Sequence, residues 1–280
     1  MLWIGGRVNQ IRLTIGICVG VVAIAFENIA VTTAMPKAAE ELGGLGSYGW
    51  VFSLFVIGSL IGTVAAGASA DVNGPVRPLV IGFVVFSAGL VVAALSPSWL
   101  VLLVARFVQG LGSGYMYVGV IVLISYAYVP PARARVLTYI SAAWVLPAFV
   151  GPITAAWLTS TLNWHWVFWS VLPVVGFAAI TSAPELLKGF EVPDGQRPKP
   201  IPLWAALTAG LGCSAVQLAG TLSGVGFVAA WGVAIVALIA SGIRLLPPGK
   251  PTRGLAPVMF SRGFASGAIF AGQSLYPLFL

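Results

Sequence analysis

Two charged side chains stand alone inside long apolar stretches of this 280-residue chain. Arg106 is the only charged residue in residues 99–126, and Glu27 is the only one in residues 13–34. A charge near the middle of a membrane-spanning helix costs roughly 2.5–3.5 kcal/mol on insertion scales, and it is retained where it faces a polar cavity or a partner. The two residues therefore indicate a functional site within the membrane.

Both charges are expected at a similar depth. Glu27 lies eight residues before Met35, about 12 Å along a helix, and Arg106 lies nine residues after Pro97, about 12–14 Å along a helix of opposite direction. A carboxylate and a guanidinium at equal depth can pair directly, or through water and Gln109, in one cavity. Glu27 is then a candidate proton carrier, because its protonation would respond to burial and to Arg106. The alternative is a static ion pair that only fixes helix packing.

A second group of candidate residues lies in the segment GASADVNGPVRP, which holds Gly67, Asp71, Gly74 and Arg77. Glycine permits a tight turn here. The Asp71 carboxylate could cap or pair with a neighbouring helix end and hold the inner side closed. A solvated turn with ordinary surface charges is the alternative.

Prolines mark the stretch AAWVLPAFVGPITAAW, which contains Pro147, Gly151 and Pro152. Each proline removes a backbone hydrogen bond and bends a helix. Two bends predict a helix that curves around a central cavity or flexes during transport, although a simple packing kink would leave the same pattern.

Composition sets the class of protein. Hydrophobic residues make up 59% of the chain and charged residues 8%, against about 25% charged residues in soluble domains. An all-α polytopic membrane protein is therefore expected. The single histidine, His165, and the two cysteines form no metal-binding or nucleophile–base pattern, so we expect neither an enzyme nor a metal.

Nine segments meet the length of about 20 apolar residues that a spanning helix needs. They lie near 13–35, 49–69, 78–96, 99–126, 136–159, 166–183, 203–221, 225–246 and 263–280. With the N-terminus inside, the inner segments hold twelve of the fourteen basic residues and the outer ones hold only Lys37. The positive-inside rule thus predicts a cytoplasmic N-terminus in the cytoplasmic membrane. The net charge of +7 follows this topology and does not indicate a nucleic-acid partner.

The polar connections predict five parts. They are a six-helix bundle over 1–183, a cytoplasmic linker over 184–202, two helices within 203–246, a cytoplasmic loop over 247–262 and a last helix over 263–280. That last helix reaches Leu280 without a polar flank, so the chain is expected to be a fragment or to end at the membrane surface.

Several motifs resemble those of the major facilitator superfamily, and most closely its fourteen-helix drug:proton antiporter branch. The resemblance rests on FENIAVTTAMP in the first helix, GASADVNGPVRP in the next loop, VARFVQGLGSG in the fourth helix, VGPITAAW in the fifth and NWHWVFWSVLP at the sixth. Within them, Glu27, Asp71, Arg106 and Gly151 stand where the family pattern places its acidic, loop, arginine and glycine residues. The helices within 203–246 would then be the insertion of this branch, and 263–280 the first helix of a second bundle that is otherwise missing.

This sequence also departs from the family pattern. Val72 and Pro75 stand where the loop motif usually has basic residues, Ala155 and Ala156 follow the Gly-Pro pair in place of glycines, and His165 replaces a common arginine. The loop change weakens any charge relay expected at the inner gate.

The resemblance implies a proton-coupled efflux transporter of hydrophobic or cationic small molecules that works by alternating access. Glu27, Arg106 and Gln109 would serve proton coupling, and the loop residues would form an inner gate. Pro147, Gly151 and Pro152 would shape the antiporter helix. Its partners would be the lipid bilayer, the substrate and protons, with no cofactor besides the proton gradient, and a full-length protein would act as a monomer. A truncated non-transporting remnant or scaffold and a proton-coupled uptake carrier are the alternatives.

Overall fold

The computed structural model describes residues 9–188, 190, 203–219 and 225–245. The chain divides into two compact units, residues 1–200 and 201–280. The boundary lies within the expected linker. The expected loop over 247–262 and the expected last helix over 263–280 fall outside the described residues.

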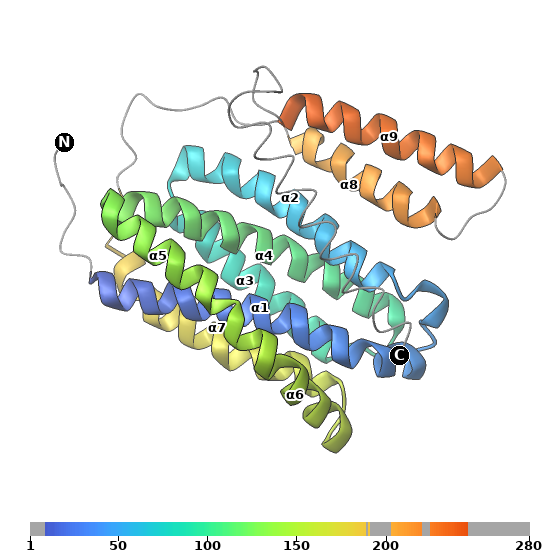
Figure 1. Cartoon of the computed structure of the whole chain (residues 1–280), viewed down its shortest axis with the longest axis horizontal. Helices are drawn as coiled ribbons and strands as arrows, with labels where there is room; N and C mark the ends of the chain where they lie inside the picture. Colours follow the sequence, from blue (N-terminus) through green and yellow to red (C-terminus); the bar gives the residue numbers. More distant parts are fainter. Residues whose placement is uncertain (1–8, 189, 191–202, 220–224, 246–280) are drawn as a thin grey trace. The chain divides into compact units, whose positions relative to one another are not determined.

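Every regular element in the described residues is a helix (Figure 1). The first unit contains α1 (Gln10–Glu41), η1 (Leu45–Ser47), α2 (Trp50–Asn73), α3 (Val76–Ala94), α4 (Trp99–Ala127), α5 (Pro130–Ala143), α6 (Val145–Thr161) and α7 (His165–Leu186). Seven helical segments of the described chain are long and apolar enough to cross a membrane. The predicted all-α polytopic fold is confirmed.

Helix α1 is longer than the sequence predicts. It continues through Pro36 to Glu41, six residues past the expected end at Met35. We expected the segment after Met35 to be an outer loop, and this is wrong for the described structure. The reason is tertiary contact, because Lys37 Nζ donates to the Thr159 carbonyl at 3.1 Å and the Glu41 carboxylate accepts from Trp164 Nε1 at 2.7 Å.

Helix α4 packs closely between α2 and α3, and glycines allow the close approach. A Cβ at Gly110 would lie 2.1 Å from the Phe55 carbonyl oxygen of α2, and one at Gly112 would lie 2.3 Å from the Phe86 nitrogen of α3. Both distances are far below van der Waals contact. Small residues at a helix interface let the backbones approach closely, and here they fix where α4 presents its polar side chains.

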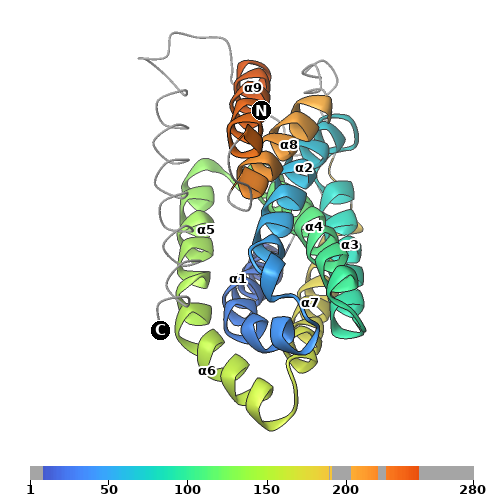
Figure 2. The same cartoon turned by 90° about the vertical axis from the view of Figure 1, so that its right-hand side faces the viewer.

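The expected fifth span is broken into two helices, α5 and α6, at Trp144. Pro147 explains the position of the break, because it lacks the N–H that would bond the Ala143 carbonyl and its ring crowds that group. As the third residue of α6, Pro147 sits where no intrahelical donor is needed. Pro152 is accommodated inside α6. Figure 2 shows α5 and α6 bending along one side of α1.

The second unit is a helical pair, α8 (Leu203–Ala219) and α9 (Val225–Leu245), which pack against each other. These helices lie within the two segments in which inserted helices are expected. At the end of the first unit, α7 continues to Leu186, so the first three residues of the expected linker are helical.

Candidate functional site

The structure brings Glu27 of α1 and Arg106 of α4 into direct contact. An Nη1 hydrogen of Arg106 is donated to Oε1 of Glu27, and the two charged groups form an ion pair. Glu27 is fully buried and Arg106 is 2% exposed. The charges therefore lie in the protein interior between helices, and neither of them faces lipid.

Three further contacts hold the guanidinium of Arg106. Its Nη1 also donates to Gln109 Oε1 at 2.8 Å, and its Nε donates to the Val51 carbonyl at 3.4 Å. Its Cζ lies 4.5 Å from the centre of the Phe55 ring, a cation–π contact. Val51 and Phe55 belong to the first turns of α2, so three helices build this site. Sequence analysis missed both α2 residues, because nothing in an apolar helix marks which side chain faces a buried charge.

Two buried polar atoms of this cluster have no hydrogen-bond partner among the described residues: Glu27 Oε2 and Gln109 Nε2. Leaving such a group unsatisfied costs about 1–3 kcal/mol. Chemically, one oxygen of Glu27 is held by Arg106 while the other is free to accept a proton. The amide nitrogen of Gln109 is free to donate a hydrogen bond next to the same guanidinium.

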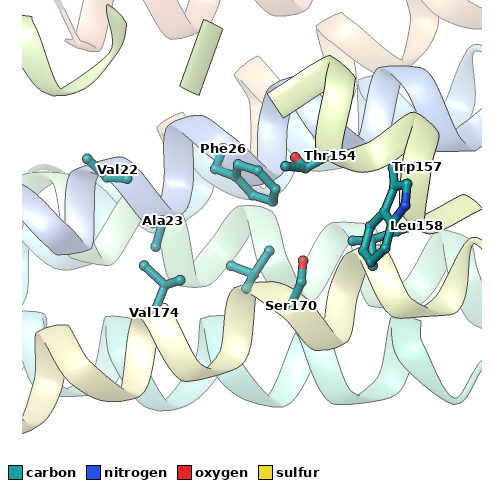
Figure 3. A pocket seen from close by; sticks show the side chains of 9 residues that line it. Val22, Ala23, Phe26, Thr154, Trp157, Leu158, Ser170 and Val174 are labelled. Carbon is teal, nitrogen blue, oxygen red and sulfur yellow. The ribbon is translucent and has the colours of Figure 1, made fainter. Parts of the chain in front are cut away.

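A pocket lies nearby, but it does not include the ion pair. It has a volume of about 240 Å³ and is lined by residues of α1, α6 and α7, including Phe26, Thr154, Trp157 and Ser170 (Figure 3). Glu27 follows Phe26 on α1, yet its carboxylate turns to Arg106 of α4. Among the described residues, no water-filled cavity is seen around the ion pair: both charged side chains are buried, and the pocket beside them is lined mainly by apolar side chains.

Three of the candidate gate residues, Asp71, Gly74 and Arg77, lie at or next to the turn between α2 and α3. Gly74 ends α2 with φ +74° and ψ −175°, a conformation that is essentially restricted to glycine. Its N–H donates to the Ala70 carbonyl at 2.9 Å, and Arg77 Nη1 donates to Asn73 Oδ1 at 2.8 Å. Asp71 is half-buried and has no hydrogen bond or ion pair within the described residues. Asn73, which sequence analysis overlooked, makes the polar contact of this turn.

The other gate residue and the antiporter-helix residues lie apart from the ion pair. Gly67 lies inside α2, with open space where a Cβ would stand. Pro147 and Gly151 are buried in α6, and Pro152 is half-buried. A Cβ on Gly151 would lie 3.2 Å from Ile29 Cγ2, so this glycine sets the approach of α6 to α1.

A polar cluster that sequence analysis missed ties the first turn of α1 to α7 and α4. Glu185 Oε2 of α7 accepts from the Asn9 backbone N–H at 2.9 Å and from Lys188 Nζ at 2.6 Å. Tyr128, just after α4, donates its hydroxyl to the Gln10 carbonyl at 3.1 Å. Burial raises the pKa of the Tyr128 phenol, which keeps this donor protonated. Carboxylates at helix N-termini are favourable, but Glu185 lies at the C-terminal end of its own helix and meets the start of α1 only in the folded chain, so no sequence signal marks it.

In the part of the chain that the structure describes, no group of three His, Cys, Asp or Glu side chains could hold a metal ion.

Comparison with known proteins gives consistent matches. The family profile described as Major Facilitator Superfamily matches residues 17–204. The multidrug transporter protein MdtP of Bacillus subtilis (strain 168) is 29% identical over 176 residues, which are 63% of this chain and 32% of that protein. An uncharacterized MFS-type transporter of Mycobacterium tuberculosis (strain ATCC 25618 / H37Rv) is 29% identical over 229 residues, 81% of this chain and 32% of that protein. The chain thus spans about a third of the length of these curated relatives.

A solved structure shares the fold. The POT family transporter PepTSo superposes with a TM-score of 0.57 at 15% sequence identity, over 84% of this chain and 53% of that one. The family profile covers more than half of the chain and includes the helices that carry Glu27 and Arg106. The chain therefore belongs to the Major Facilitator Superfamily of membrane transporters.

Proposed function

We propose that the chain belongs to a proton-coupled efflux transporter that exports hydrophobic or cationic small molecules across the cytoplasmic membrane, with its N-terminus in the cytoplasm. Membership of the superfamily supports a transport role, and the multidrug relative supports the substrate class. The twelve basic residues on one side of the predicted topology support the orientation. Transport needs the bilayer, the substrate and protons, and no other cofactor or nucleic acid.

The buried pair of Glu27 and Arg106 is the observation that carries this proposal. A deprotonated Glu27 neutralises the Arg106 guanidinium in a site without water-exposed surface. Protonation at the free oxygen Oε2 would remove the negative charge and weaken the attraction between α1 and α4. Arg106 would then turn to its remaining partners, Gln109 and the Val51 carbonyl. Proton binding would thereby change the packing of the helices that face the substrate.

The remaining candidate residues have supporting roles in the proposal. Asp71 and Arg77 would close the cytoplasmic side, with Gly67 and Gly74 shaping the helix and turn that carry them. Asp71 has no partner within the described residues, so its partner in the closed state would come from elsewhere in the transporter. Gly151 and Pro152 would hold α6 against α1 and limit leak, and Pro147 would set the bend between α5 and α6.

Reconstitution tests the proposal. The chain is reconstituted in liposomes with an imposed pH gradient. Addition of a lipophilic cationic dye such as ethidium should then cause a flux of protons out of the liposomes. Glu27→Gln should abolish this flux, because the amide keeps the shape and cannot carry a proton. Glu40→Gln is the matched control, since Glu40 is an exposed carboxylate on the same helix. Unchanged flux in Glu27→Gln would remove Glu27 from the mechanism.

Two outcomes would point to the alternatives. Dye that crosses the membrane in the same direction as the protons would indicate a proton-coupled uptake carrier. A folded chain with no dye-dependent flux would indicate a truncated remnant or a scaffold that does not transport by itself.

A further inference from the structure

The pocket beside the ion pair has its own chemistry. Its lining comes from three helices and contains no charged side chain: Val22, Ala23, Phe26, Thr154, Trp157, Leu158, Ser170, Val171 and Val174. The two hydroxyl groups in the lining are already bonded within their own helices. Thr154 Oγ1 donates to the Val150 carbonyl at 2.8 Å, and Ser170 Oγ donates to the Val167 carbonyl at 2.7 Å. The surface thus suits hydrocarbon and has no group that would neutralise a cation.

The residues that line the pocket are spread along the helix axes. Helices α1 and α6 run parallel in register, because Gly151 packs on Ile29 and Thr159 contacts Lys37, eight residues further along each helix. Trp157 therefore lies near the level of Met35, thirteen residues beyond Val22, which corresponds to about 20 Å along the axis. Figure 3 shows Val22 and Val174 at one end of the pocket and Trp157 and Leu158 at the other. We call this pocket the α1–α6–α7 groove.

Two walls of the groove are formed by α6 and α7. Both helices pack on α1, but they contact each other little. Trp157 on α6 is 61% exposed, and Phe177, one turn after the lining residue Val174 on α7, is 56% exposed. Exposed apolar side chains of this kind are compatible with contact to lipid tails in a membrane. The groove is therefore suited to lipid hydrocarbon.

A positive charge stands at one end. Lys37 is exposed, and its ammonium bonds the carbonyl of Thr159, the residue after the lining residue Leu158. The neighbouring carboxylate of Glu41 is engaged by the Trp164 indole. An apolar channel that ends beside an ammonium group is complementary to a molecule that has a hydrocarbon chain and a phosphate.

We propose that the α1–α6–α7 groove binds one acyl chain of a membrane phospholipid, with the lipid phosphate at Lys37. A cavity of about 150 Å³ lined by apolar side chains is known to hold benzene, so a groove of about 240 Å³ has room for a longer hydrocarbon segment. Such a lipid would bridge α6 and α7 and support the bend of the α5–α6 pair. The proposal depends on the membrane-spanning fold and is independent of the proposed proton coupling.

Photocross-linking tests the acyl-chain site. The full chain is reconstituted with phosphatidylglycerol that carries a photoreactive diazirine in one acyl chain, and cross-linked residues are mapped by mass spectrometry. Cross-links should concentrate on the groove lining. Val174→Trp should reduce their yield about tenfold, the factor expected when two methylene groups of the chain are displaced from the groove. Ile180→Trp, at an exposed position of the same helix, should leave the yield unchanged.

Ser170→Leu fills the groove from its middle and keeps the test valid if Val174→Trp does not fold. Equal labelling of all exposed apolar residues, or unchanged labelling in a folded filled variant, would overturn the proposal. Loss of labelling on addition of ethidium would assign the groove to substrate, and protection by a second copy of the chain in a cross-linked dimer would assign it to an interface. Either result would also contradict a lipid site.

The phosphate contact is tested with a second probe. Lys37→Gln should lower the labelling by photoreactive phosphatidylglycerol several-fold and leave labelling by a photoreactive diacylglycerol, which lacks the phosphate, unchanged. Equal effects on both probes would show that Lys37 acts only through α6 packing and would overturn the phosphate contact.

Discussion

The guanidinium carbon of Arg106 lies 4.5 Å from the centre of the Phe55 ring. The contact joins α4 to α2 at the point where α4 also pairs with α1 through Glu27. A desolvated cation–π contact contributes about 2 kcal/mol, so the ring is a substantial partner for this charge. We therefore expect Phe55 to position Arg106 when Glu27 is neutral, because the ion pair would then no longer hold the guanidinium.

We predict that Phe55→Leu lowers the free energy of unfolding by about 2 kcal/mol, through loss of the cation–π contact and of ring packing. It should also shift the pH dependence of proton flux, because Arg106 loses its partner in the protonated state. Phe52→Leu is the control, since that ring packs edge-on against Tyr48, whereas the ring beneath Arg106 is Phe55. A pH profile that stays the same in Phe55→Leu would show that Phe55 is only a packing residue.

The ion pair itself can be measured by a double-mutant cycle. Glu27→Leu and Arg106→Leu should each lower the free energy of unfolding by about 3–5 kcal/mol, because each leaves one buried charge without its partner. The double variant should lose less free energy of unfolding than the two single variants lose together, and the difference is a coupling energy of about 1–3 kcal/mol. Unfolding in mixed micelles monitored by circular dichroism gives the four values. Simple additivity would mean that the two charges do not stabilise each other.

The pairing of Glu27 and Arg106 could be anticipated from the sequence because charges in apolar spans are rare and the helix rise fixes their depth. The support from Val51 and Phe55 could not, since the rotation of α2 about its axis depends on its packing against α4. That packing is set by steric contacts such as that of Gly110 with Phe55, which a composition pattern does not reveal.

The ends and bends of helices also depend on tertiary contacts that the sequence pattern does not reveal. The apolar pattern of the first span stops at Met35, but Lys37 and Glu41 make contacts with α6 and Trp164 that keep the last turns of α1 helical. For the fifth span, two prolines predict two bends. The described chain breaks once, at Trp144, because Pro147 falls in the first turn of a new helix while Pro152 is accommodated within it.

The close approach of α2 and α4 predicts that alanine is much more destabilising at Gly110 than at Gly20, although both glycines are buried. Gly110→Ala should lower the free energy of unfolding by about 1–3 kcal/mol or more, because its Cβ would lie 2.1 Å from a backbone oxygen that cannot easily move. Gly20→Ala should be tolerated, since its Cβ would meet only the side chains of Met116 and Phe83, at 3.6 Å or more. Thermal unfolding in detergent compares the two. Equal melting temperatures would contradict the tight α2–α4 contact.

The turn between α2 and α3 allows a last comparison of two glycine-to-alanine substitutions. Gly74→Ala should lower the free energy of unfolding by about 1–3 kcal/mol, because a side chain at φ +74° and ψ −175° strains the backbone. Gly67→Ala should instead be neutral or raise it by up to about 1 kcal/mol, since this helical glycine has open space around its missing Cβ and alanine is the better helix former. The same unfolding assay checks both variants.

If the proposed gate is also correct, Gly74→Ala should slow dye transport more than its loss of stability explains, because the turn orients Asp71 and Arg77. Transport that falls only in proportion to the folded fraction would leave Gly74 with a structural role alone.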